Sequence, residues 1–329
     1  MKEYRRIENE DGSIVETYWR DGEKHREDGP AEIERWADGT VIESYWQNGQ
    51  RHRLAKDGHY VGPALIVRRA NGRETEESYW QNGKLHRDNR PASIMYSGNG
   101  RETQESYWQN GKLHREGGPA LIVRRTIESY WRDGKLHRED GPAEIEQYAD
   151  GTVSESYWRD GKEHREDGPA EIVRCADGTV SESYWQNGER HREDGPAMID
   201  RWTDGGVSES YFQNNNLHRE DGPAMIDRRA DGCVSAERYS RDGKLHREDG
   251  PAHIMYRTDG SVMRERYWRD GKKHREDGPA EIERRADGSV SESYWHDGKK
   301  HRENGPAEIV RSADGTVIRE SYWRNGAAM

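Results

Sequence analysis

Four residue types that often carry chemistry recur side by side along this chain, as in His274-Arg275-Glu276-Asp277. Imidazole and carboxylate groups at this spacing suit acid–base or metal chemistry. Eleven of the 14 histidines, however, precede an arginine at the same place in a repeated unit. An active site needs one arrangement of defined asymmetry, whereas about eleven near-equivalent copies indicate a role in the repeat itself. We therefore predict turn caps and ion pairs between neighbouring repeats, with no catalytic residue, no metal site and no cofactor. The chain is predicted not to be an enzyme.

A Tyr-Trp pair marks the repeat that positions these residues. It occurs, for example, at Tyr157-Trp158 and Tyr184-Trp185, and the usual spacing is 27 or 28 residues. All 11 prolines occupy one slot, ten of them in Gly-Pro-Ala. Such self-similarity is the signature of a repeat architecture. We predict a single repeat domain over residues 1–329, with about eleven repeats, an irregular region at 51–131 and a half repeat at the C-terminus.

Each repeat contains three turn signals with short strands between them. In one regular copy, Asp160-Gly161 and Asp177-Gly178 favour tight hairpins, and Asp167-Gly168-Pro169 ends a ladder. Residues 180–185 alternate with period two, which places Ser181, Ser183 and Trp185 on one face and Val180, Glu182 and Tyr184 on the other. No segment shows a helical period. The fold class is therefore predicted to be all-β, an elongated, open-ended meander of antiparallel β-hairpin repeats, with stacked tyrosines and tryptophans as its core.

The spacing Trp-x-x-Gly-Lys-x-His, as in Trp131-Arg132-Asp133-Gly134-Lys135-Leu136-His137, resembles the MORN repeat family. This unit is four to five residues longer and inserts Arg-Glu-Asp before Gly-Pro-Ala, so it is similar to a longer MORN-like variant. The resemblance implies an antiparallel meander and a role at protein or membrane surfaces, and it implies no active site.

Composition narrows the function classes further. The chain has 36% charged residues, a net charge of −11, 12 Trp and 17 Tyr. Its charge disfavours direct binding of nucleic acid, because phosphate would be repelled over most of the surface. The N-terminal residues are polar, and Cys175 and Cys233 stand at different places in the repeat, so we expect a cytoplasmic protein without a disulfide framework.

Deviations from the repeat gather in residues 51–131. This segment has 14 basic and 9 acidic residues, a net charge of +5, whereas the rest of the chain has a net charge of −16. It contains an insertion at 54–59, Arg90 in place of glycine, and the loss of a hairpin turn between Arg125 and Thr126. Its first strands also replace glutamates with apolar residues that we expect on one outer surface, rimmed by arginines. The predicted partner-binding residues are Leu65, Val67, Arg68, Arg69, Arg90, Met95, Leu121, Val123, Arg124 and Arg125. Drift within a duplicated sequence is the alternative explanation.

We therefore expect a non-enzymatic protein-interaction repeat protein that docks a macromolecular partner through residues 51–131. A more specific version is an inhibitor or effector that blocks a nucleic-acid-binding cleft on a protein partner with its acidic remainder. The alternative is a membrane-surface or anionic-lipid adaptor that uses the basic segment. Open strand edges leave a homodimer as a further option.

Overall fold

A computed structural model describes residues 1–55, 58–97, 99–124 and 126–329, and it divides them into two units, Met1–Lys162 and Glu163–Met329. The described residues form strands, turns and bends without a helix, so none of them forms a helix that could span a membrane. Cys175 and Cys233 are both free.

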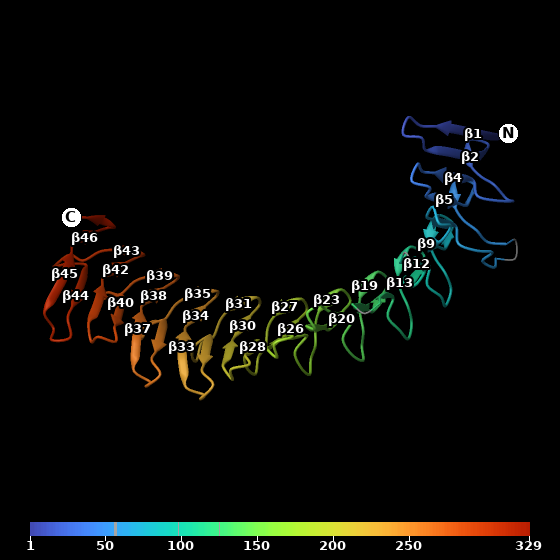
Figure 1. Cartoon of the computed structure of the whole chain (residues 1–329). Helices are drawn as coiled ribbons and strands as arrows, with labels where there is room; N and C mark the ends of the chain where they lie inside the picture. The colour runs from blue at the N-terminus through green and yellow to red at the C-terminus, as the bar shows by residue number, and fades with distance from the viewer. Residues whose placement is uncertain (56–57, 98, 125) are drawn as a thin grey trace. The chain divides into compact units, whose positions relative to one another are not determined.

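Long strands of the first unit pair antiparallel with their neighbours in chain order (Figure 1). These strands are β1 (Lys2–Glu8), β2 (Ile14–Arg20), β4 (Glu32–Arg35), β5 (Val41–Ser44), β8 (Leu65–Arg68), β9 (Glu74–Ser78), β12 (Ser93–Tyr96), β13 (Glu102–Ser106), β16 (Leu121–Val123), β17 (Ile127–Ser129), β20 (Glu144–Gln147) and β21 (Val153–Ser156).

The second unit repeats this arrangement with its own consecutive antiparallel pairs. Its long strands are β24 (Glu171–Arg174), β25 (Val180–Ser183), β28 (Met198–Arg201), β29 (Val207–Ser210), β32 (Met225–Arg228), β33 (Val234–Arg238), β36 (His253–Tyr256), β37 (Val262–Arg266), β40 (Glu281–Arg284), β41 (Val290–Ser293), β44 (Glu308–Arg311) and β45 (Val317–Ser321). The predicted all-β class and the antiparallel meander order are thus confirmed within each unit.

Short hairpins lie beside the long strands. In most repeats the first strand of the hairpin begins at the second residue of the aromatic pair, and each of the two strands has two residues. In the first unit they are β3 (Glu23–Lys24), β6 (Trp46–Gln47), β7 (Gln50–Arg51), β10 (Trp80–Gln81), β11 (Lys84–Leu85), β14 (Trp108–Gln109), β15 (Lys112–Leu113), β18 (Trp131–Arg132), β19 (Lys135–Leu136) and β22 (Trp158–Arg159), with β23 (Lys162–Glu163) at the boundary. In the second unit they are β26 (Trp185–Gln186), β27 (Glu189–Arg190), β30 (Phe212–Gln213), β31 (Asn216–Leu217), β34 (Ser240–Arg241), β35 (Lys244–Leu245), β38 (Trp268–Arg269), β39 (Lys272–Lys273), β42 (Trp295–His296), β43 (Lys299–Lys300), β46 (Trp323–Arg324) and β47 (Ala327–Ala328).

The turns of these short hairpins need left-handed backbone at both central positions. Asp270 has φ of 48° and Gly271 has φ of 78°, as a type I′ turn requires. In the one copy that lacks the glycine, Asn214 and Asn215 have φ of 50° and 64°. Asparagine tolerates this conformation better than most residues, so the turn is retained without glycine.

The sheet has two distinct faces, and both are thinly covered. On one face lie the alanine of Gly-Pro-Ala and the following isoleucine; Ala64 is fully buried and Ile66 is 4% exposed. On the other lie small buried serines such as Ser78 and Ser106, which accept hydrogen bonds from the indole nitrogens of Trp80 and Trp108 at 2.8 Å. We call these the isoleucine face and the tryptophan face.

An arginine after each repeat histidine clamps its own repeat. The guanidinium carbon of Arg275 lies 3.9 Å from the centre of the Tyr267 ring, and its Nη1 donates to the carbonyl of Pro279 at 3.2 Å. A Cβ on Gly278 would lie 3.1 Å from the same carbon, so the glycine leaves room for the guanidinium. The backbone nitrogen of Arg275 also donates to the carbonyl of Trp295 in the next repeat at 3.3 Å. The His-Arg and Gly-Pro-Ala motifs of a repeat therefore pack directly against each other.

The histidine of the same motif also joins successive repeats. Its Nδ1 accepts a hydrogen bond from the backbone nitrogen of the next repeat's turn residue, as between His25 and Asn48 at 3.1 Å and between His274 and Asp297 at 3.2 Å. Because Nδ1 must be unprotonated to accept, the bond selects the tautomer with the proton on Nε2.

The predicted stacks of aromatic rings need correction. Ring pairs among the described Tyr and Trp residues are few, and cations lie between the tryptophans instead. The guanidinium of Arg51 lies 5.2 Å from the Trp46 ring and 5.3 Å from the Trp80 ring. Where the residue before the repeat histidine is a lysine or an arginine, adjacent repeats therefore contact through alternating rings and cations, which interact by attraction between the positive charge and the ring face. In other copies a leucine takes this place, as Leu85 does beside Trp80.

We predict that Arg275→Lys destabilises the second unit by about 1 kcal/mol or more, because lysine keeps the charge but loses the planar contact with Tyr267 and the directed bond to Pro279. The midpoint of urea unfolding measures the change. Arg324→Lys, at an exposed position of β46, is the control and should leave the midpoint unchanged. An equal midpoint for wild type and Arg275→Lys would contradict the clamp.

Candidate interaction face

Five predicted apolar residues lie on the tryptophan face of the first unit, in two rows across the strands. Leu65 and Leu121 belong to the row that contains Ser78, Ser93 and Ser106. Val67, Met95 and Val123 belong to the next row, where they alternate with Glu76 and Gln104. The register thus brings together residues that are up to 58 positions apart in the chain.

The first row is structural in character. In other copies, the residue at the Leu65 position contacts the residue before the repeat histidine. Glu32 forms such an ion pair with Lys24, and Glu308 forms one with Lys300 at 3.1 Å. Leu113 and Leu121 are separated by the same number of residues as these pairs. Leu65 and Leu121 are only partly exposed, so we assign them mainly to packing between the long and short strands.

The second row is longer than predicted and contains the most exposed of the five residues. Met95 is 40% exposed, and Val67 and Val123 are partly exposed. Ile42 pairs with Val67, and Ile127 pairs with Val123, so both extend the row. The sequence does carry a signal for these two, because regular copies have serine at this strand position, as at Ser181. We call Ile42, Val67, Met95, Val123 and Ile127 the outer row.

The predicted arginine rim is only partly beside this row. Arg68 lies on the isoleucine face, where it bonds Glu43 at 2.6 Å and Glu74 at 2.9 Å. Arg124 bonds Glu102 at 2.7 Å and also reaches Glu105, which lies on the isoleucine face as well. The alternation of side chains explains this placement, since Arg68 is one residue beyond Val67 and points to the opposite side.

The remaining predicted arginines lie outside the two strand rows. Arg69 is exposed in a turn closed by its backbone bond to Arg73. Arg90 is exposed in the place of glycine, yet Arg87 still bonds the carbonyl of Pro91 at 3.1 Å and lies 3.6 Å from the Tyr79 ring. Arg125 lies outside the described residues.

The insertion covers part of the neighbouring repeat. Leu54 and Tyr60 form an isolated bridge, and the Tyr60 hydroxyl donates to the carbonyl of His86 at 2.6 Å. The Tyr60 ring meets Tyr79 edge-on at 5.8 Å between centres. Burial raises the pKa of Tyr60 to about 12. The insertion is therefore anchored to the sheet at Tyr60, with Val61 beside it 63% exposed. Lys56 and Asp57 lie outside the described residues.

The shortened hairpin leaves a small hollow at the end of the outer row. A space of about 200 Å³ is lined by Val123, Ile127, Ile145 and their neighbours. Backbone bonds from Arg124 to Thr103 and from Gln147 to Thr126 join the short hairpin to the strands on both sides. The irregular repeat geometry thus combines an intact sheet with a local recess, which is also lined by the polar Thr126, Glu128 and Gln147.

The isoleucine face of this segment contains a glutamate whose pKa is raised. Burial, followed by a hydrogen bond from its carboxyl to Glu74, raises the pKa of Glu77 to about 7. Burial and the nearby carboxylates of Glu77 and Glu102 also raise the pKa of Tyr96. The proton shared by Glu74 and Glu77 relieves repulsion between two carboxylates beside each other.

Comparisons with known proteins give no assignment. No family model matches the chain, and no curated protein matches it. A solved structure of the Danio rerio CPAP TCP10 domain with a STIL peptide has 14% identity and a TM-score of 0.22, covering 98% of this chain and 100% of that one. The TCP domain of Drosophila melanogaster SAS-4 with a proline-rich motif of Ana2 has 12% identity and a TM-score of 0.18, covering 70% and 86%. These scores are too low to establish a common fold.

The pKa of Glu77 predicts a pH dependence of stability. Because the folded chain holds this proton more tightly than the unfolded chain does, the contribution is fully present below about pH 4.5 and is lost as pH rises through about 7. Wild type should therefore lose stability between about pH 5 and pH 8, and Glu77→Gln should lose less. Urea midpoints at both pH values test this, with Glu128→Gln at the equivalent strand position as the control. Identical pH responses for wild type and Glu77→Gln would rule the prediction out.

Proposed function

We propose that this chain is a non-enzymatic protein-interaction repeat protein that docks a protein partner through the outer row of its first unit. The observation that carries the proposal is the alignment of Ile42, Val67, Met95, Val123 and Ile127 on one sheet face, where Met95 is exposed and the other four are partly exposed. The same row in the second unit is mixed: it contains the apolar Val173, Met255 and Val310, but they are separated by the charged Asp200, Asp227, Arg264 and Glu283.

The outer row has properties that favour an interface. Exposed aliphatic side chains contribute little to an isolated sheet, whereas each one buried by a partner contributes roughly 1–2 kcal/mol. Polar Glu76 and Gln104 separate the apolar residues and can supply hydrogen bonds at the rim of the contact. Val61 adds further exposed apolar surface in the same segment, and the hollow beside Val123 adds a recess with both polar and apolar lining.

The distribution of charge along the chain favours a partner that has both acidic and basic patches. Residues 51–131 have a net charge of +5 and the remainder −16, so an acidic patch on the partner would be attracted to the segment and a basic one to the rest. An inhibitor that covers a basic nucleic-acid-binding cleft with its acidic repeats is the specific form of this proposal. We also propose that the chain is a long-repeat variant of the MORN family and that it works in the cytoplasm.

We predict that Val67→Glu combined with Met95→Glu weakens partner binding by at least about tenfold, or about 1.4 kcal/mol. The fold should persist, because glutamate occupies the Val67 position at Glu34 and Glu146. The partner is first identified by affinity capture and mass spectrometry, and its affinity for purified wild type and variant is then measured by biolayer interferometry.

A closely matched control is Val173→Glu with Met255→Glu in the second unit. Met95 and Met255 each lie in an Ile-Met-Tyr strand with a bulge after the methionine, and Val67 and Val173 each lie in Ile-Val-Arg. The control should bind the partner as wild type does. Equal affinities for all three proteins would refute the assigned face. Binding to anionic vesicles that only the first variant loses would replace the protein partner with a lipid surface.

A further inference from the structure

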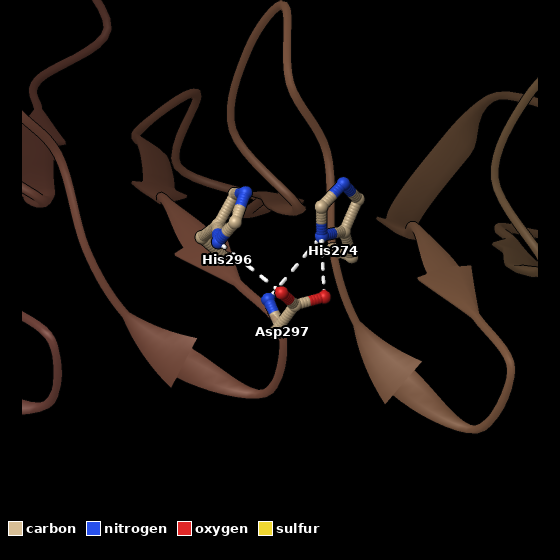
Figure 2. Close-up of side chains that lie close together, drawn as sticks. All are labelled: His274, His296 and Asp297. Carbon is tan, nitrogen blue, oxygen red and sulfur yellow. Dashed lines mark hydrogen bonds and ion pairs between the residues drawn. The ribbon is translucent and has the colours of Figure 1, made fainter.

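The second unit contains a cluster of metal-ligand side chains that the repeat alone does not provide. His274, His296 and Asp297 each offer one ligand atom, and these atoms lie within 4.8 Å of one another (Figure 2). Nδ1 of His274 is 3.2 Å from Oδ1 of Asp297, and Nδ1 of His296 is 3.5 Å from its Oδ2. Figure 2 shows both imidazoles turned toward this carboxylate.

Two of these residues belong to the repeat and the third does not. Equivalent histidine–aspartate pairs lie 3.0 Å apart at His137 and Asp160 and 3.1 Å apart at His218 and Asp242. His296 takes a place that regular copies fill with glutamine or arginine, as at Gln186. The substitution adds a second imidazole to an existing pair, and the two rings are 4.7 Å apart.

The distances suit a small divalent ion with nitrogen and oxygen ligands. Zinc binds imidazole and carboxylate at about 2.0–2.2 Å in a tetrahedron, so its ligand atoms lie roughly 3.3 Å from each other. The two separations, each to a different oxygen of Asp297, are close to this value, and all three ligand atoms lie within 4.8 Å of one another. The His296 side chain is 54% exposed, so its ring can turn inward without disturbing a core.

The surroundings of His274 also fit a metal ligand. Its Nδ1 accepts the backbone N–H of Asp297 at 3.2 Å, which leaves the proton on Nε2, and Nε2 lies 3.6 Å from the carboxylate of Glu276 without a hydrogen bond between them. The side chain of His274 is 8% exposed, so its ring is held in place. A bound ion would replace the backbone N–H of Asp297 on that lone pair.

We propose that His274, His296 and Asp297 form a site for a divalent metal ion of the zinc class, which links the turn of β42 and β43 to the preceding repeat. Three protein ligands leave a fourth position for water or for a ligand from a partner. The site depends on His296 alone among the deviations from the repeat, and it is independent of the outer row.

Titration of the full chain with Co²⁺, followed by displacement with Zn²⁺, tests the proposal. Wild type should bind one equivalent with the visible absorption of a tetrahedral cobalt complex. His296→Gln and Asp297→Asn should each weaken that binding by at least about tenfold. Both replacements occur at these positions in other copies, as Gln186 and Asn187, so the fold should be retained.

A gain of function completes the design. Adding Arg241→His to the His296→Gln protein places a new imidazole beside His218 and Asp242, and it should restore one equivalent of binding. Zn²⁺ should also raise the melting temperature of wild type and not that of His296→Gln. Indistinguishable cobalt spectra and affinities for wild type and His296→Gln would overturn the proposal.

Discussion

The arginine that follows each repeat histidine is the contact on which the rest of this fold depends. One guanidinium covers a tyrosine ring, bonds a proline carbonyl four residues later and fills the space that a glycine leaves open, as Arg138 does with Tyr130 and Pro142. The backbone of the same residue bonds the next repeat. A chain with so little aliphatic core is therefore held together by cation–ring contacts within repeats and by backbone contacts between neighbouring repeats.

This dependence changes how the deviations are interpreted. Charged residues that recur in every copy are committed to the array, so function is expected where a copy differs without losing its clamp. Arg87 keeps its contacts although glycine is replaced by Arg90, and the short hairpin keeps its bonds to both neighbours. The outer row and His296 are two such differences, and they concern different units and different chemistry.

Much of the fold could be predicted from the sequence because turns and strand alternation are local properties. The glycine turns, the strand positions and the structural role of His-Arg follow from residues close in the chain. The face of the sheet on which Arg68 lies and the contacts that anchor Tyr60 could not be predicted in this way. Arg68 pairs with Glu43, 25 residues away, and Tyr60 bonds His86, 26 residues away. Such contacts depend on register between repeats, and the cations between the tryptophans depend on it as well.

The most direct test of the central claim, that the histidine–arginine motif serves as a connector between repeats, is nuclear magnetic resonance of the imidazole nitrogens. Long-range proton–nitrogen spectra at about pH 8 distinguish the two neutral tautomers of each ring. We expect the repeat histidines, including His25 and His164, to hold the Nε2–H tautomer, with Nδ1 accepting from the next turn. Rings that carry the proton on Nδ1, or that average freely between the two tautomers, would contradict the account.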